Sequence, residues 1–596
     1  MDWNHELLAS LIWVGKAFAI SLVLMTLAVL WVCRATEWGR QVKRLAWPTL
    51  DPRKHWKPLA TLVLIVLLTL MAVRMNVLFS FWYNGAYTAM QKLDAPGFWT
   101  MMVVFGVLAT VHVARALLAF YVRQSFLIHW RRALTENLMQ QWLDRQTYFR
   151  SQYLARQIDN PDQRIQQDVT QFVDSTLTLS MGLLNAVVSL ITFTVMLWSL
   201  SGVLAMFGIQ IPRAMVFLAY IYVAVATVFA VWLGRPLIRL NFLNERFNAD
   251  FRYALIRLRE YGENIAFYRG EKVEQATLAS RFANVIQNMW AILFRSLKLQ
   301  GFNLGVSQLA LVFPMIVQAP RLFAKEIQLG DLMQTMEAFG QVQDALSFFR
   351  TSYDEFATYR AVVVRLSGFL DAIDETAALP EVSVTSDGAK VAVVGLTIRS
   401  PAQAMLLDHL DLALAPGASL LIRGPSGVGK TTLLRALAGL WPFAEGQVIR
   451  PQGADALFLS QRPYLPLGTL RAALHYPMPA TASDEAAEVL RRCQLGHLVD
   501  KLDEDADWSR TLSLGEQQRL AFGRALLAKP AVIFLDESSS AMDEGLEHAM
   551  YSLLREVLPV ATLVSVGHRS SLLAFHQQTL TLLGAGRWQI EPAQIA

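Results

Sequence analysis

The residues with the clearest chemical pattern lie between Gly424 and Thr431, where the sequence reads GPSGVGKT. A β-rich run, SLLIR, precedes this loop and a helical run follows it. The glycines allow backbone N–H groups to close around phosphate oxygens, and the helix N-terminus adds its positive dipole end. Lys430 is expected to reach the β- and γ-phosphates, and Thr431 to ligate Mg²⁺. The residues assigned to the nucleotide here are Gly424, Pro425, Ser426, Gly427, Val428, Gly429, Lys430, Thr431 and Thr432.

A second group of polar residues ends the apolar run AVIFLDE, at Asp536 and Glu537. A strand that ends there places its carboxylates at the C-terminal edge of a sheet, where ligands bind in α/β folds. Asp536 is expected to hold the metal through water, and Glu537 to act as general base on the attacking water. An Asp-Glu pair after an apolar run is weak evidence by itself. The phosphate loop upstream makes ATP hydrolysis the favoured interpretation.

The elements that must position these residues form an α/β domain. From residue 391 onward, short β-rich runs alternate with helical runs, which predicts a largely parallel sheet. Residues 372–390 are small and polar and contain proline, which is typical of a linker. We therefore expect a membrane domain with cytoplasmic helical extensions over residues 1–371, a linker over 372–390 and a nucleotide-binding domain over 391–596.

The first part of the chain has the composition of a membrane protein. Hydrophobic residues make up 54% of the sequence and charged residues 17%, a balance that soluble proteins rarely show. Since a membrane span needs about 20 apolar residues, the sequence predicts about seven transmembrane helices. Six are apolar runs, and the seventh is a more polar helix that packs inside the bundle and lines an aqueous space. The apolar runs are residues 11–32, 59–83, 98–121, 177–200, 214–233 and 302–317, and the seventh is 327–349. The first run has no cleavage pattern and is expected to remain as an extra N-terminal span.

Charge in the loops predicts the orientation. Residues 34–58 and 122–174 each carry seven Lys or Arg, whereas residues 84–97 carry one lysine and 201–213 one arginine. Because positive loops face the cytoplasm, the N-terminus is expected in the periplasm and the nucleotide domain in the cytoplasm of a bacterial inner membrane. The net charge of +5 arises beside apolar runs, so no nucleic-acid partner is expected. The cysteines, Cys33 and Cys493, lie too far apart to suggest a disulfide framework.

Residues 386–596 resemble the nucleotide-binding domain of an ABC transporter. The resemblance implies that Gln461 joins the metal and the water to the membrane domain, that His568 contacts the γ-phosphate, and that Asp543 orders a dimer seam. It gives Thr431, Gln461 and Asp536 as the metal site. The motifs that carry it are, in order, GPSGVGKTT, Gln461 in LFLSQRPYLPLGTL, LSLGEQQRLAFGRALL, VIFLDESSSAMD and His568 in SVGHR.

The segment LSLGEQ implies a second copy of the chain. In the family resembled, Ser513, Gly515 and the residue at position 516 face ATP that is bound to the opposing nucleotide domain. One chain contains one phosphate loop and one such segment, so it cannot complete its own site, and a homodimer is expected. Leu514 replaces the usual glycine and Glu516 the more frequent glutamine. The aromatic residue that usually stacks on adenine is missing from VVGLTIRSPAQ.

Two membrane-domain stretches, residues 81–94 and 158–169, resemble the SbmA/BacA-like transporters and, more distantly, the peroxisomal fatty-acyl half-transporters. The first grouping implies uptake of peptides or hydrophilic compounds such as corrins through an exporter-like fold. The second implies export or flipping of lipid or acyl-CoA. A membrane protein gated by ATP is the alternative from another class, which the combination of Lys430, Glu537 and His568 disfavours. Asp159 to Arg164 form either a helix that docks beside Gln461 or a solvated hairpin.

Charged residues inside the predicted spans need partners or a cavity, because a central arginine costs roughly 2.5–3.5 kcal/mol on insertion scales. For Arg74 and Arg115, cavity lining and pairing within the bundle are equally compatible with the sequence. Glu337, Gln341 and Asp344 follow each other at spacings of four and three, which places them on one helical face. These three are the favoured cavity-lining residues.

Overall fold

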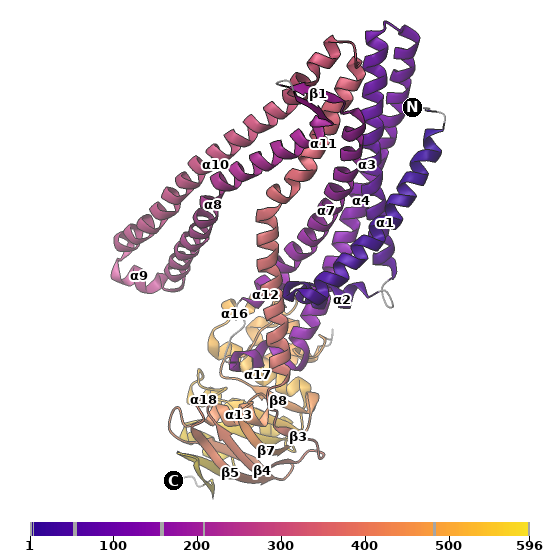
Figure 1. The fold of residues 1–596 in the computed structure, drawn as a ribbon. Coiled ribbons are helices and arrows are strands. Elements are labelled where there is room, and N and C mark those ends of the chain that lie inside the picture. Colours follow the sequence, from indigo (N-terminus) through magenta and orange to yellow (C-terminus); the bar gives the residue numbers. More distant parts are fainter. Residues whose placement is uncertain are drawn as a thin grey trace. The chain divides into compact units, whose positions relative to one another are not determined.

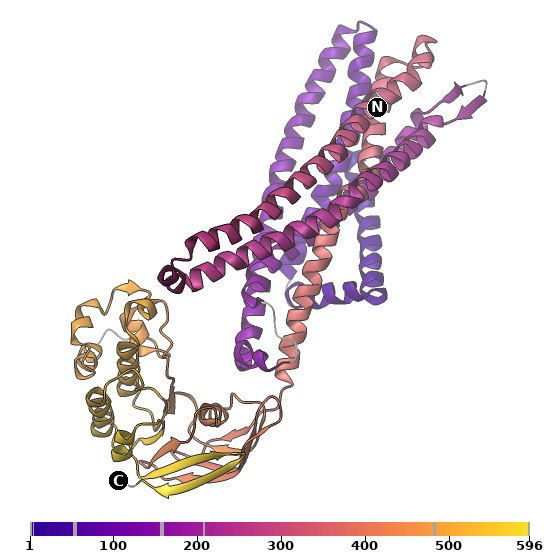
Figure 2. The ribbon, with the colours of Figure 1, turned by 90° about the vertical axis from the view of Figure 1, so that its left-hand side faces the viewer.

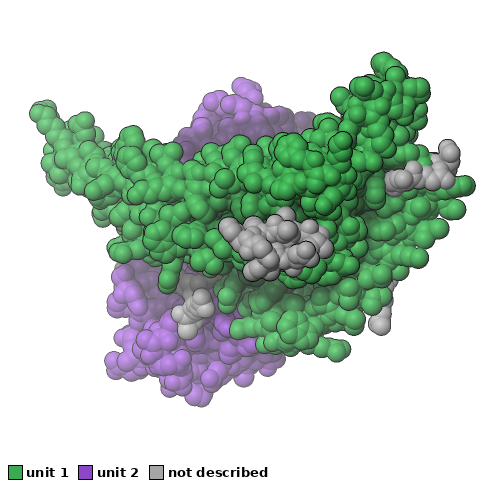
Figure 3. Space-filling model, turned by 45° about the horizontal axis from the view of Figure 1, so that its top comes forward, with its two compact units in different colours: residues 1–140, 160–370 green, residues 141–159, 371–596 purple. Residues whose placement is uncertain are grey.

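The structure is a computed structural model that describes residues 3, 5–51, 56–154, 160–206, 209–480 and 484–593. The chain forms two compact units, coloured in Figure 3. The first contains residues 1–140 and 160–370, and the second residues 141–159 and 371–596. The second unit thus includes a short segment from the middle of the helical region.

The first unit is a bundle of long helices. Six helices of the described chain are long and apolar enough to cross a membrane, and each contains one of the six predicted apolar runs. α8 and α10 pack along each other and are joined at their ends by α9, as Figures 1 and 2 show. The helices are α1 (Glu6–Ala35), α2 (Glu37–Leu50), α3 (Trp56–Gln91), α4 (Ala95–Leu143), α6 (Pro161–Gln163), α7 (Val169–Leu200), α8 (Ala214–Glu260), α9 (Gly262–Tyr268), α10 (Glu271–Phe323), α11 (Leu329–Thr351) and α12 (Tyr353–Ala377).

α11 is the seventh, polar helix that the sequence predicts. It is not among the six candidate spans, and it packs against α3, α7, α8 and α10. Its apolar residues Ala338, Phe339 and Val342 are fully buried in a core cluster of the bundle. The helix is therefore stabilised by its neighbours, which explains why it need not be apolar on every face.

In its described residues, the second unit contains two large sheets and a short antiparallel pair of strands, β9 (Gly468–Thr469) with β10 (Asp505–Ala506). β6, β12, β11, β8 and β13 are parallel to their neighbours, with β14 antiparallel at the edge, in the order β14-β13-β6-β12-β11-β8. A second sheet has the order β3-β7-β4-β5. The strands are β3 (Ser383–Thr385), β4 (Val391–Arg399), β5 (Met405–Leu414), β6 (Ser419–Arg423), β7 (Ala444–Ile449), β8 (Ala456–Leu459), β11 (Val532–Asp536), β12 (Thr562–Val566), β13 (Gln578–Gly584) and β14 (Arg587–Pro592).

Two buried apolar clusters hold this unit together. One lies between the sheets and includes Phe534, which stacks on Phe458 at 4.2 Å. The other joins the helices to the parallel sheet and includes the fully buried Trp508 and Tyr551. The main helices are α13 (Lys430–Leu437), α14 (Leu470–His475), α15 (Glu485–Arg492), α17 (Leu514–Ala528) and α18 (Glu544–Val557). The architecture confirms the predicted α/β fold class.

Residues 372–390, expected to be a linker, contain regular structure at several points. α12 continues to Ala377 because Ala372, Ile373 and Thr376 are buried, and β3 joins the second sheet. The segment is small and polar, but it also contains good helix formers that continue the preceding helix.

Residues 141–154 are held by the second unit. Arg150 donates to the carbonyl oxygens of Leu379 and Pro380 at 3.1 and 3.2 Å and pairs with Glu381. The ring of Tyr153 lies 5.1 Å from that of Trp441. The short helix α5 (Thr147–Arg150) is fixed by these contacts.

Candidate nucleotide-binding site

The phosphate loop lies between β6 and α13, as the sequence predicts. Gly424 and Gly429 have backbone φ values of +145° and +110°, which residues other than glycine rarely adopt. A Cβ at Gly424 would lie 2.6 Å from the carbonyl oxygen of Leu582. The Nζ atom of Lys430 donates to the carbonyl oxygens of Gly424 and Pro425 at 3.0 and 2.9 Å. The loop therefore curls around the lysine ammonium, next to the N-terminus of α13.

Thr431 and Asp536 meet at the edge of the parallel sheet. The Thr431 hydroxyl donates to Asp536 Oδ1 at 3.2 Å. Burial raises the pKa of the Asp536 carboxyl, and the Glu537 carboxylate adds to this, while Thr431 and Lys430 oppose it. A hydroxyl and a carboxylate are oxygen ligands of the kind that Mg²⁺ takes together with substrate phosphates, so these residues fit the ion. No group of three or more His, Cys, Asp or Glu side chains that could hold a metal ion by itself occurs in the described part of the chain, and a metal that phosphates help to hold does not need one.

Glu537 lies between the two other predicted catalytic residues. Gln461 Nε2 donates to Glu537 Oε2 at 3.2 Å, and His568 Nε2 lies 3.4 Å from Glu537 Oε1. The backbone of Glu537 has φ +49°, a strained value for a residue that is not glycine, and its N–H donates to Val566 O at 3.1 Å. The strain and the two side-chain contacts direct the carboxylate toward the sheet edge, beside Asp536.

Ser513 begins α17 as its N-cap. The Ser513 hydroxyl donates to Glu516 Oε2 at 2.7 Å, and the Ser513 N–H donates to the same oxygen at 2.9 Å. His497 Nε2 lies 3.0 Å from Glu516 Oε1. The hydrogen bond from Ser513 lowers the pKa of Glu516. Glu516 thus closes a capping box, a role that the spacing S-x-x-E could have revealed.

Gly515 and Gln518 fix the start of α17 to the loop after β11. A Cβ at Gly515 would lie 3.0 Å from Ala541 O. Gln518, fully buried, donates to Gln461 O at 2.9 Å and to Ser540 Oγ at 3.1 Å, and it accepts from Ala541 N at 3.0 Å. One amide therefore joins three motifs. Nothing in the sequence spacing singles out Gln518.

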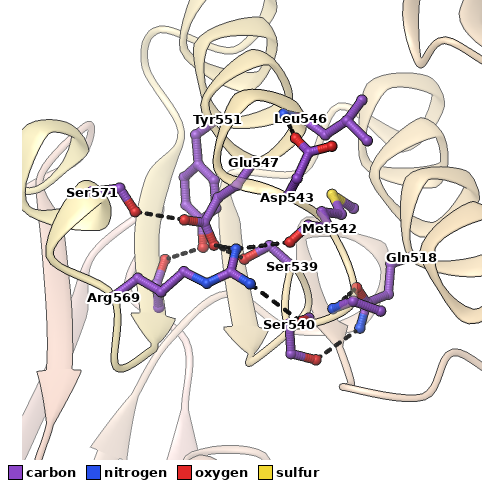
Figure 4. Close-up of polar contacts among 12 residues, drawn as sticks. Gln518, Ser539, Ser540, Met542, Asp543, Leu546, Glu547, Tyr551, Arg569 and Ser571 are labelled. Carbon is purple, nitrogen blue, oxygen red and sulfur yellow. Dashed lines mark hydrogen bonds and ion pairs between the residues drawn. The ribbon is translucent and has the colours of Figure 1, made fainter.

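A buried carboxylate ties the loop after Glu537 to the segment after His568 (Figure 4). Glu547 is 2% exposed and accepts from the hydroxyls of Ser539 and Ser571 at 2.5 and 2.7 Å. Arg569 lies 3.5 Å from Glu547 and donates to Met542 O at 2.8 Å. The residues on either side of the predicted catalytic pair are thus connected through one polar network.

Asp543 caps α18 within its own chain, because its Oδ1 accepts from Leu546 N at 2.7 Å (Figure 4). No hydrogen bond joins Ser513 or Gly515 to residues 424–432 in the described chain. The roles of Asp543, Ser513 and Gly515 toward a second copy stay predictions.

The membrane unit contains a cavity of about 360 Å³ beside α11. Glu337 and Asp344 line it together with Tyr83 and Tyr87, whose rings stack at 6.3 Å. Gln341 does not line the cavity but donates to Glu337 at 3.0 Å. The polar face of α11 therefore borders a hollow in the bundle.

The charged residues inside the spans have bundle partners. Arg74 pairs with Glu6 and donates to Ser10 Oγ at 3.1 Å, and Arg115 donates to Leu68 O at 3.2 Å. For Arg74 and Arg115, these contacts favour pairing within the bundle over lining of a cavity. Of the stretch proposed for coupling, Asp159 lies outside the described residues. Arg164 is buried and pairs with Asp168 at 2.8 Å.

Two family models match the chain. The model described as ABC transporter transmembrane region 2 matches residues 45–323, and the model described as ABC transporter matches residues 407–540. An uncharacterized ABC transporter ATP-binding protein of Haemophilus influenzae is 48% identical over 99% of this chain and 100% of the relative.

Two other relatives are more distant. The inner membrane ABC transporter ATP-binding protein YddA of Escherichia coli is 30% identical over 87% of this chain and 93% of its own. The human lysosomal cobalamin transporter ABCD4 is 28% identical, and the match covers 85% of this chain and 88% of the relative. The SbmA/BacA-like grouping gains no support from these relatives.

Among solved structures, a bacterial Atm1-family ABC exporter with ATP bound resembles the fold with a TM-score of 0.68. It is 18% identical, and the match covers 90% of this chain and 95% of that chain. The likeness confirms the exporter-like fold predicted for the membrane bundle and the nucleotide domain.

Proposed function

Because this chain belongs to the ABC transporter family, as a membrane-spanning ATPase, we propose that two identical copies form an ATP-driven transporter of the bacterial inner membrane. One observation carries the proposal: Glu537 lies within 3.2 Å of Gln461 and 3.4 Å of His568, beside the Thr431–Asp536 pair, in a chain whose described residues include six candidate spans. A protein that only binds ATP has no use for a base held in this way.

The phosphate loop binds the triphosphate, and each polar residue has a role that its position supports. Lys430 donates to β- and γ-phosphate oxygens. Thr431, Asp536 and Gln461 would hold Mg²⁺, which would neutralise charge on the β- and γ-phosphates. Glu537 accepts a proton from the attacking water as the water oxygen bonds to the γ-phosphorus, and the bond to the ADP oxygen breaks. His568 donates to the γ-phosphate.

Each site is completed by the second copy. Ser513, Gly515 and the N-terminus of α17 face the triphosphate of the partner, and Asp543 lies at the seam. The capping box at Ser513 supports this role, because it fixes the orientation of the helix N-terminus whose N–H groups would meet phosphate. A closed ATP dimer and its reopening after hydrolysis would drive the change in membrane access.

The cargo we propose is a peptide or another hydrophilic compound, such as a corrin, taken up into the cytoplasm. The cavity beside α11 supports it, since two carboxylates, Glu337 and Asp344, and two tyrosines line this cavity. Carboxylates attract cationic or polar cargo and repel the phosphates of acyl-CoA or a phospholipid. A human relative is named for cobalamin transport. The basic loops support an N-terminus in the periplasm and a nucleotide domain in the cytoplasm.

Proteoliposomes test both cargo and direction. Vesicles are loaded with a labelled cationic peptide or a labelled corrin, and ATP is added outside, where it reaches only copies with outward nucleotide domains. Uptake into the cytoplasm corresponds here to release of the cargo from the vesicles. Release that requires ATP and is lost in Glu537→Gln supports the proposal. Accumulation of external cargo would indicate export, and no ATP-dependent movement of either cargo would contradict the proposed substrates.

A further inference from the structure

A second cavity of the membrane unit lies between α1, α2 and the beginning of α3. Its volume is about 630 Å³, within the range of roughly 300–1,000 Å³ that is common for ligand sites. From α1 it is lined by Phe18, Leu22, Met25 and Val29, which lie on one helical face. α3 contributes Leu59, Leu62, Val63 and Val66. The walls are therefore almost entirely apolar.

α1 has little protein around it. Of its residues, all of which are described, only Ser21 is buried. Ala17, Phe18 and Met25 pack near Leu70 and Leu184 in a small cluster, and Phe18 and Met25 also line the cavity. The rest of this face is open to an apolar ligand in the described chain.

α1 turns sharply into α2, as the indigo part of the ribbon in Figure 2 shows, and direct contacts fix this corner. The hydroxyl of Thr36 caps α2 by accepting from Gly39 N at 3.1 Å. A Cβ at Gly39 would lie 2.3 Å from Val32 O. On α2, Thr49 is buried and accepts from Trp130 Nε1 of α4 at 3.0 Å. Contacts within the protein thus fix the position of α2 against α1 and α4.

The charges of the cavity lie at one end. Arg34 and Lys43 line it there, and neither forms an ion pair with a carboxylate of the described chain. Lys43 Nζ lies 5.6 Å from the ring of Trp47. From Phe18 to Arg34, α1 rises about 24 Å, close to one leaflet with its headgroups at about 20–22 Å. The cavity has the length and polarity of one lipid.

We propose that this cavity binds a membrane phospholipid with an anionic headgroup. An acyl chain lies between α1 and α3, and the headgroup phosphate meets Arg34 and Lys43. Basic groups at the end of a span attract anionic lipids, and the apolar walls exclude a polar ligand. The lipid supplies the contact that α1 lacks and attaches this helix to the bundle. The site is separate from the cavity beside α11 and does not depend on the cargo.

Photo-crosslinking tests the site in the full-length protein. The protein is placed in phosphatidylcholine nanodiscs that contain phosphatidylglycerol with a diazirine on one acyl chain. Mass spectrometry then maps the labelled residues. Labels are expected on residues 22–33 and 59–66, with competition by unlabelled phosphatidylglycerol and not by phosphatidylcholine. Labels spread evenly over the lipid-facing helices, or equal competition by both lipids, would overturn the proposal.

Charge variants test the headgroup contact. Arg34→Gln and Lys43→Gln are each expected to reduce labelling by about fivefold. Lys16→Gln, the same kind of change on α1 outside the cavity lining, should leave labelling unchanged. Equal effects of all three changes would contradict a headgroup site at Arg34 and Lys43. The ATPase rate of each variant shows that the protein is folded.

A steric pair tests the acyl-chain contact. Leu22 lines the cavity, whereas its neighbour Val23 does not. Leu22→Trp should fill the cavity and remove the labels on residues 59–66, and Val23→Trp should not. If both variants label like the original protein, the acyl chain does not occupy this cavity.

Discussion

Replacing Arg569 with methionine tests the polar network behind the hydrolysis site. The change leaves the Glu547 carboxylate, 2% exposed, without its cation 3.5 Å away and leaves Met542 O without a donor. Breaking a fully buried pair costs about 3–5 kcal/mol. Because the Arg569 side chain is 35% exposed and two serine hydroxyls remain on Glu547, we expect about 2 kcal/mol.

Thermal unfolding of the detergent-solubilised protein measures this loss. For a unit of this size, about 2 kcal/mol lowers Tm by about 4–8 °C. Arg510→Met is the matched control. The Arg510 side chain is 87% exposed and lies 3.5 Å from Asp507, so its loss should change Tm by less than about 2 °C. We also expect a lower kcat for ATP with little change in KM, because the network positions the residues around Glu537 and His568 and does not contact the phosphate loop.

A double-mutant cycle shows whether the pair itself is responsible. In a Glu547→Gln background there is no buried charge to leave unpaired, so Arg569→Met should cost about half as much or less. An unchanged Tm for Arg569→Met, or the same loss in both backgrounds, would refute the reasoning.

Three further changes probe the site. Glu537→Gln should leave ATP binding intact and lower turnover by about 10²–10⁴-fold, and an ATPase assay that finds substantial hydrolysis would remove Glu537 as the base. Gly515→Ala should lower both Tm and ATPase activity, since the added Cβ would lie 3.0 Å from Ala541 O. An unchanged Tm and ATPase rate would mean that the loop containing Ala541 moves to accommodate the methyl group, against this prediction. Glu516→Gln should destabilise at pH 7, because Ser513 lowers the pKa of Glu516 in the fold. The Glu516 carboxylate stabilises the folded protein at pH values above the unfolded pKa of about 4.3, and this stabilisation is lost as pH falls through the lower pKa of the folded state. The unfolding curves of the original protein and of Glu516→Gln should therefore converge in acid. A stability difference that does not depend on pH would contradict this.

The sequence predicts the part of the site that depends on local pattern. The phosphate loop, the strand that ends at Asp536 and the six apolar runs follow from spacing within a few tens of residues, and the structure has them there. The meeting of Gln461, Glu537 and His568 follows from the family resemblance, since residues so far apart in sequence are joined only by the parallel sheet.

Other features depend on contacts that have no local signal. Gln518 is one amide in a helix, and only the fold brings Gln461 O, Ser540 and Ala541 around it. The pairing of Glu547 with Arg569 likewise has no local signal in the sequence, because the two residues come from different elements. The continuation of α12 through the expected linker also depends on burial, because a small polar segment is helical when Ile373 and Thr376 have neighbours to pack against.

Hybrid dimers give the most direct test of the two-copy site. Lys430→Ala and Ser513→Arg chains with different tags are co-expressed, and the hybrids are purified through both tags. Each hybrid keeps one site with an intact phosphate loop from one copy and an intact Ser513 from the other, so we predict one occluded ATP per hybrid and none in either homodimer of the variants. Hybrids that occlude no ATP, while the unaltered dimer does, would contradict ATP binding between two chains.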